Sequence, residues 1–178
     1  MTAFDLNEKF PLVIIPFRPF QHLLAVDDQL ACLKNAKRHL APGGRLVFDL
    51  FQTDARRMHD PFFLQERPVP GEVTLEDGRV VRLSERTTAF HRAIQCNDVE
   101  LIYYVTHPGG RVERLANPFR IRYFFRYEAE HLLARAGLRV AELFGDFTRA
   151  PLRDDSPEMI FVAEHARQRS APTIPARA

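Results

Sequence analysis

Apolar residues at the start of the chain are spaced as in a strand, a helix and a second strand. Residues 10–16 form a continuous, β-branched apolar run, as in a strand buried on both faces of a parallel sheet. Helical spacing follows from Leu30 to Leu40, with an acid supplied at the N-cap by residues 25–28. Residues 41–44, Ala-Pro-Gly-Gly, end that helix, and residues 45–51 form a second buried strand. Such a β-α-β unit implies a right-handed crossover and a parallel sheet.

Between residues 71 and 125 the apolar period changes to two. One alternating stretch ends at the turn Asp77-Gly78, a second covers residues 99–105 before Pro-Gly-Gly, and a third covers residues 119–125. This pattern is typical of antiparallel strands with one apolar and one polar face. We therefore expect an inserted antiparallel sheet of three or four strands.

Helical spacing returns over residues 126–136 and ends at Gly137, a favourable left-handed C-cap. Two further apolar runs, residues 138–144 and 159–163, predict the last two strands, and the proline- and arginine-rich tail from residue 166 predicts disorder. The chain is thus expected to divide into a β-α-β part (1–60), an inserted antiparallel sheet (71–125), a helix with two strands (126–165) and a tail (166–178).

Composition narrows the class of protein. The 178 residues are 46% hydrophobic and 27% charged with a formal net charge of +2, which suits one globular domain. Interleaved charges give no footprint for nucleic acid or for an anionic membrane, and no apolar run is long enough to span a bilayer. Cys32 and Cys96 favour two buried thiols over a disulfide, and we expect a cytoplasmic protein.

Residues 40–49 match the pattern L-x-P-G-G-x-L-V-F-D, in which a helix stop leads directly into a strand. With the strand and loop of residues 10–24, the Ala-Gly-Leu turn at 136–138 and the Ser-Pro at 156–157, this pattern resembles the second half of class I S-adenosylmethionine-dependent methyltransferases. The resemblance implies an α/β fold, namely a partial Rossmann-like sheet made of strands four to seven. It also implies that the antiparallel segment is a β lid of the kind found in small-molecule N- and O-methyltransferases.

The same resemblance implies that strands one to three, the glycine-rich cofactor loop and the ribose-binding acid are not in this sequence. The adjacent glycines, Gly43-Gly44 and Gly109-Gly110, are interpreted as a helix stop and a hairpin turn. We expect an N-terminally truncated form, inactive alone and incomplete for S-adenosylmethionine, with Met1 at the cofactor-contacting end of strand three. Residues 12–15 would then be a bare apolar sheet edge.

Candidate site residues follow from the topology, since ligands of open α/β sheets bind beyond the carboxyl ends of the strands. Pro16, Phe17 and Arg18 are expected beside the cofactor, and His22 is the candidate general base because imidazole titrates near neutral pH. The expected contacts to a small-molecule methyl acceptor are Gln21, Asp49, Arg120 and Tyr123. No metal site is expected, because the histidines and cysteines lack ligand spacing.

Each assignment has a structural alternative. His22 could be a helix-facing or solvated histidine, Arg18 an ion-pair partner of the lid or of an interface, and Phe17 a core residue. Asp49 could cap the following loop, and Arg120 could lie on the outer face of its sheet.

Three functions stay open at this point: a small-molecule methyltransferase, a non-catalytic interaction module, and a fragment without a separate function. The interaction module would use the exposed strand edge, and a homodimer through that edge or the lid is the partner arrangement it suggests.

Overall fold

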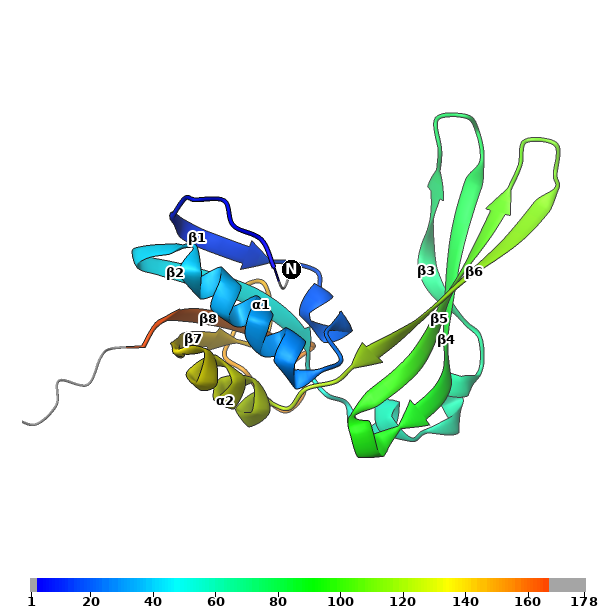
Figure 1. Cartoon of the computed structure of the whole chain (residues 1–178). Helices are drawn as coiled ribbons and strands as arrows, with labels where there is room; N and C mark the ends of the chain where they lie inside the picture. Colours follow the sequence, from blue (N-terminus) through cyan, green and yellow to red (C-terminus); the bar gives the residue numbers. More distant parts are fainter. Residues whose placement is uncertain (1–2, 167–178) are drawn as a thin grey trace, which may run out of the picture.

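A computed structural model describes residues 3–166 as two four-stranded sheets and two α-helices (Figure 1). The core sheet has the order β1-β2-β8-β7, with β1 (Phe10–Ile15), β2 (Leu40–Phe51), β8 (Glu158–His165) and β7 (Leu138–Phe144). The inserted sheet has the order β3-β4-β5-β6, with β3 (Arg67–Thr74), β4 (Val80–His91), β5 (Cys96–Thr106) and β6 (Val112–Arg122). The helices are α1 (Val26–Arg38) and α2 (Arg126–Ala136). The expected α/β sheet with an antiparallel insertion is confirmed.

The core sheet is parallel between β1 and β2 and antiparallel at β2–β8 and β8–β7. Helices α1 and α2 pack against each other and lie on the same side of this sheet (Figure 1). The apolar core between them and the sheet contains a chain of aromatic rings, in which Phe48 contacts both Phe20 and Phe161. Burial of this apolar surface is the main force that holds the core together.

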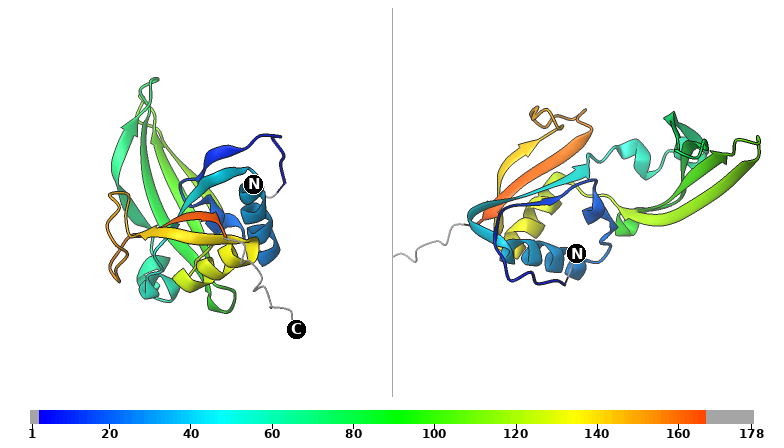
Figure 2. Two further views of the ribbon diagram at one scale, coloured as in Figure 1. Left: turned by 90° about the vertical axis from the view of Figure 1, so that its left-hand side faces the viewer. Right: turned by 90° about the horizontal axis from the view of Figure 1, so that it is seen from above.

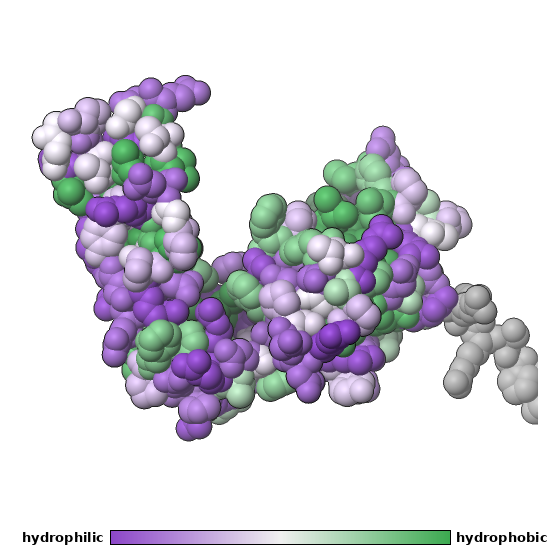
Figure 3. All heavy atoms as spheres, turned by 180° about the vertical axis from the view of Figure 1, so that it is seen from behind, coloured by the Kyte–Doolittle hydropathy of each residue, from purple (hydrophilic) through white to green (hydrophobic). Residues whose placement is uncertain are grey.

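The opposite face of the core sheet is uncovered at β1. Leu12 is 54% exposed and Ile14 is 59% exposed, so the expectation that this strand is buried on both faces is wrong for the described residues. The side chains of β1 are apolar, as the sequence indicates, but an apolar strand is buried on both faces only where other elements cover both faces of the sheet. Strand β1 is also the edge of the sheet, as expected, and apolar side chains gather over that part of the surface (Figure 3).

Two details of the first helix differ from the expectation. Its N-cap is Ala25, which makes no side-chain cap, while Asp27 and Asp28 lie in the first turn, where acids favour the helix dipole. The helix ends at Arg38, and Leu40 already pairs with Phe10 of β1. The Pro-Gly-Gly segment therefore makes a bulge within β2 rather than stopping the helix.

The inserted sheet is a four-stranded antiparallel meander. The tight turns at Gly78 and Gly110 lie where the sequence predicts them, and both glycines have positive φ. The middle connection is the 3₁₀ turn η4 (Arg92–Ile94), followed by Gln95 with φ of 55°. The sheet is strongly twisted and projects to one side of the core (Figure 2).

The second helix and β7 have the bounds that the sequence predicts, because Gly137 ends α2 with φ of 78°. Both cysteines are free and buried, as expected. No helix between residues 3 and 166 is long and apolar enough to cross a membrane. Met1 and the tail after Ala166 lie outside the described residues.

Candidate functional site

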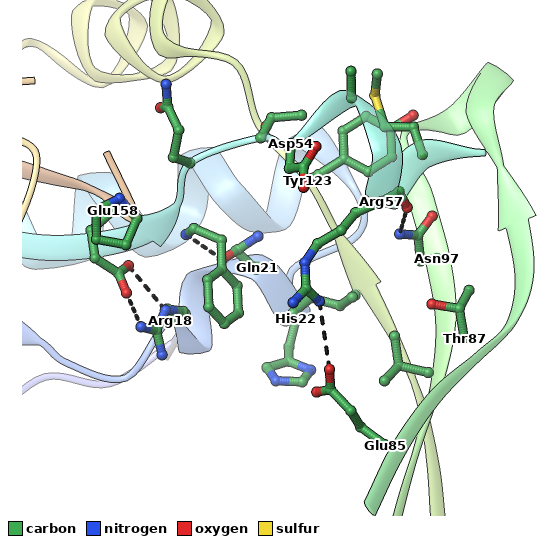
Figure 4. A pocket seen from close by; sticks show the side chains of 18 of the residues that line it. Arg18, Gln21, His22, Asp54, Arg57, Glu85, Thr87, Asn97, Tyr123 and Glu158 are labelled. Carbon is green, nitrogen blue, oxygen red and sulfur yellow. Dashed lines mark hydrogen bonds and ion pairs between the residues drawn. The ribbon is translucent and has the colours of Figure 1, made fainter. Parts of the chain in front are cut away.

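A cavity of about 850 Å³ lies between the core sheet and the inserted sheet (Figure 4). Its core side is formed by residues that follow the carboxyl ends of β1 and β2, and by the loop that leads into β8. Its far wall is the inserted sheet, with Val99, Leu101, Phe119, Ile121 and Tyr123 on one face. Seen from behind, the molecule is hollowed between the two parts (Figure 3). A volume of this size suits a small-molecule ligand.

The turn after β1 has a strained backbone. Phe17 and Arg18 have φ values of 66° and 60°, and the left-handed region costs a non-glycine residue about 1–2 kcal/mol. The side chain of Phe17 is 86% exposed at the cavity, so it is not a core residue. Such strain persists where surrounding contacts fix the turn. Pro16 precedes this turn and does not line the cavity.

Arg18 supplies those contacts. Its guanidinium forms a bidentate pair with Glu158, which is buried at the start of β8, and it lies 3.8 Å above the ring of Phe51 (Figure 4). Its Nε is 3.8 Å from Oδ2 of the buried Asp49, and that oxygen has no hydrogen bond within residues 3–166. Arg18 therefore pairs with two buried carboxylates of the core sheet, not with the inserted sheet, while still lining the cavity.

Asp49 does not line the cavity. It is 3% exposed and lies beneath Arg18, so the structure does not bring it to a substrate.

His22 ends the 3₁₀ turn η1 (Pro19–His22) and projects into the cavity (Figure 4). Its ring contacts Phe119 of the inserted sheet at 5.3 Å between centroids. The imidazole is exposed and within reach of a ligand in the cavity. The structure thus places the candidate base between the two walls of the site.

Tyr123 also lines the cavity, as expected. Burial raises the pKa of its hydroxyl, which therefore stays a neutral hydrogen-bond donor at physiological pH.

Arg120 is the clearest correction. It lies on the opposite face of β6 from Phe119, Ile121 and Tyr123, because side chains alternate along a strand. Its guanidinium forms a bidentate pair with Asp98 of β5, at 2.5 and 2.9 Å. The alternative of an outer-face charge is the one that the structure shows.

Gln21 borders the cavity but is only 2% exposed. Each end of its amide makes one hydrogen bond to a backbone group, at Phe51 and at Arg122. A contact of Gln21 with substrate stays a prediction.

A polar group of residues that the sequence did not reveal lies at the end of the cavity nearest β4 and β5. Arg67 pairs with Glu85 at 2.8 Å, and Arg57 approaches the same carboxylate at 3.8 Å (Figure 4). Asn97 donates to the backbone oxygen of Arg57 at 2.8 Å, and Thr87 lies beside it. These residues come from distant segments without a local motif, and only the strand register brings them together.

The described residues do not form a complete site for S-adenosylmethionine. No glycine between residues 3 and 166 lines the cavity. Gly44 lies against the backbone oxygen of Phe10 at the amino end of β1, whereas the cavity lies beyond the carboxyl ends of the strands. Backbone approach to such a cofactor is what a glycine-rich loop provides. Between residues 3 and 166 there is also no cluster of three or more His, Cys, Asp or Glu side chains that could hold a metal ion.

Comparison with known proteins gives a consistent result, although no family model matches the chain. The chain is 28% identical over 149 residues to the dTDP-3-amino-3,4,6-trideoxy-α-D-glucopyranose N,N-dimethyltransferase of Streptomyces venezuelae. That match covers 82% of this chain and 57% of the relative, so the chain spans little more than half of that relative's length.

Solved structures show the same fold. CalS10, a S-adenosylmethionine-bound amino pentose methyltransferase from Micromonospora echinaspora, is 25% identical with a TM-score of 0.65. A S-adenosylmethionine-dependent methyltransferase from Clostridium acetobutylicum is 13% identical with a TM-score of 0.72. Each match covers 93% of this chain and 62% of the other.

Proposed function

We propose, on the premise that this chain has part of the fold of the S-adenosylmethionine-dependent methyltransferases, that it forms the acceptor-binding part of an enzyme that methylates an amino sugar. The observation that carries the proposal is the cavity between the two sheets, with His22 projecting into it. The names of the relatives, an amino sugar dimethyltransferase and an amino pentose methyltransferase, support nitrogen as the methylated atom.

The lining suits a small polar amine. Tyr123, Thr87 and Asn97 present hydrogen-bonding groups, and the faces of Phe119 and Ile121 give apolar contact to a ring. An amine must lose its proton before it can act as a nucleophile, and the position of His22 in the cavity lining supports it as the group that takes that proton. Phe119 packs against the imidazole and restricts its orientation.

The cofactor is the other half of the proposal. Because the described residues do not fit it alone, residues outside this chain would complete its site, with Phe17 and Arg18 contributing from the turn after β1. Calorimetry with S-adenosylmethionine on the 178-residue chain should show no binding. One-to-one binding at micromolar concentration would show that the site is complete after all.

His22 is tested in a longer form of the protein, in which residues added before Met1 give methylation of an amino sugar. In that form, His22→Ala should lower turnover by about 10²-fold or more. His59→Ala is a matched control, because His59 is outside the cavity lining and should leave turnover unchanged. Equal turnover of His22→Ala and the parent would remove His22 from the mechanism.

A second candidate function is an interaction module, and the uncovered apolar face of β1 favours it. The module would pair β1 with a second copy of the chain. A discrete dimer by light scattering, dispersed by Ile14→Lys, would support it, and a monomer would count against it.

A further inference from the structure

The inserted sheet meets the core mainly where β6 packs against η1. The chain leaves the core sheet after Phe51, the last residue of β2, and β6 returns it at Arg122. Any rotation of the inserted sheet relative to the core must therefore occur around these two connections. The cavity lies directly beside them, so their geometry determines its width.

One buried side chain is bonded to both connections. Gln21 in η1 accepts a hydrogen bond from the backbone N–H of Phe51 at 3.0 Å and donates one to the backbone oxygen of Arg122 at 2.8 Å. A backbone N–H can only donate and a carbonyl can only accept, so this orientation of the amide is the one that satisfies both. The amide of Gln offers a donor and an acceptor from one planar group that stays uncharged at every physiological pH.

Two neighbouring contacts also hold these connections, but in a different way from Gln21. Thr53 donates to the backbone oxygen of Phe124 at 2.5 Å, which joins the two connections to each other. Phe124 is fully buried against Phe20, which anchors the returning segment in the core. Neither contact reaches both connections from the core, whereas Gln21 does.

We propose that Gln21 is a positioning residue that fixes the angle between the inserted sheet and the core, and with it the width of the cavity. Its removal leaves one partly buried backbone donor and one partly buried acceptor without partners, which is unfavourable unless water reaches them. Rotation of the inserted sheet would admit that water. The proposal concerns the conformation of the chain, so it holds or fails independently of the methyltransferase proposal.

The test measures distances between the core and the inserted sheet, which change when the angle between them changes. Spin labels are placed at Lys34→Cys on α1 and Glu76→Cys at the β3–β4 turn, in a background of Cys32→Ala and Cys96→Ala. Both label positions are exposed. Double electron–electron resonance on the full chain then gives the distribution of distances between core and inserted sheet. Gln21→Met should broaden and shift this distribution, while the far-ultraviolet circular dichroism stays that of the parent.

The matched control is Gln52→Met, since Gln52 also lines the cavity but no hydrogen bond of its side chain is seen within residues 3–166. It should leave the distances unchanged. A second readout is amide hydrogen exchange at Phe51, which should be about fivefold faster in Gln21→Met, because about 1 kcal/mol of hydrogen bonding is lost. A role limited to stability would lower the melting temperature without moving the label distances.

Unchanged label distances in a folded Gln21→Met protein would overturn the proposal. If that variant does not fold, Gln21→Ser decides, because its short side chain reaches neither backbone group and leaves space for water that can hydrogen-bond to both. It should shift the label distances, and a distribution equal to that of the parent would overturn the proposal as well.

Discussion

The core sheet and the inserted sheet are built from the same kind of strand but are held by different forces. The core sheet lies under two helices, and its fully buried side chains include Phe20, Phe48, Phe124 and Phe161. In the inserted sheet, few apolar side chains are buried, while arginine–carboxylate pairs connect successive strands. These pairs are Arg67–Glu85, Arg86–Glu100 and Arg120–Asp98.

The difference indicates which part is autonomous. Burial of apolar groups is insensitive to salt and strengthens the core without help from a ligand. Partly exposed ion pairs each contribute little and are screened by salt. The inserted sheet should therefore depend on its attachment to the core, and on what fills the cavity, more than the core depends on it.

The largest expected effect is in the core. Phe48→Ala removes a fully buried ring stacked on Phe161 at 5.1 Å, and it should lower the free energy of unfolding by about 3–5 kcal/mol. Leu115→Ala in the inserted sheet, where the side chain is 49% exposed, should change it by less than about 0.5 kcal/mol. Urea unfolding of both variants measures the two free energies of unfolding. Equal losses of stability would show that the two sheets do not differ in how much apolar burial stabilises them.

A backbone change in the core should have an intermediate effect. Gly137→Ala forces a left-handed residue and brings Cβ against Nζ of Lys37, so it should cost about 1–2 kcal/mol. The Lys37 chain end is flexible and can move away. The same substitution in a Lys37→Ala background should therefore retain most of the loss, and full recovery there would mean that the clash rather than the backbone is responsible.

A smaller effect is expected in the inserted sheet, and it should depend on pH. Hydrogen bonds from Arg120 and then His91 hold the pKa of Asp98 far below its usual range. A lowered pKa in the folded state gives stability that is present above the ordinary pKa of about 4 and is lost as pH falls toward the folded value. Asp98→Asn should thus cost about 0.5–1 kcal/mol at pH 7. The gap between variant and parent should narrow below about pH 4 in thermal unfolding, and a constant gap would contradict the assignment.

The smallest expected effect comes from salt. Raising sodium chloride from about 0.05 to 1 M screens exposed pairs, so amides of β4 and β5 should exchange with deuterium less than about twofold faster. Core amides of β2 and β8 should not change. Faster exchange in both sheets would mean that ion pairs are not what distinguishes them.

Local signals made some elements predictable from the sequence. The end of α2 and the whole of β7 were assigned correctly because Gly137 can adopt a left-handed conformation that other residues avoid. Acids near the start of α1 were less informative, since Asp27 and Asp28 favour the dipole from within the first turn as well as from a cap. Similarly, a proline followed by two glycines is compatible with a β-bulge as well as with the end of a helix, so this segment does not distinguish the two.

The site was only partly predictable for a different reason. Alternation along β6 separated Arg120 from Phe119 and Tyr123, but it could not tell which face meets the cavity. Gln21 was placed near the site correctly, yet its partners, Phe51 and Arg122, lie 30 and 101 residues away. Such roles depend on three-dimensional packing, which no pattern within a single segment encodes.

The bond from Thr53 to the backbone of Phe124 places the departure and the return of the inserted sheet at one point of the core. A segment inserted in this way can be replaced by another of different length or strand number without moving the elements on either side of it. Changes in the inserted sheet would therefore alter the wall of the cavity while the strands of the core sheet keep their register.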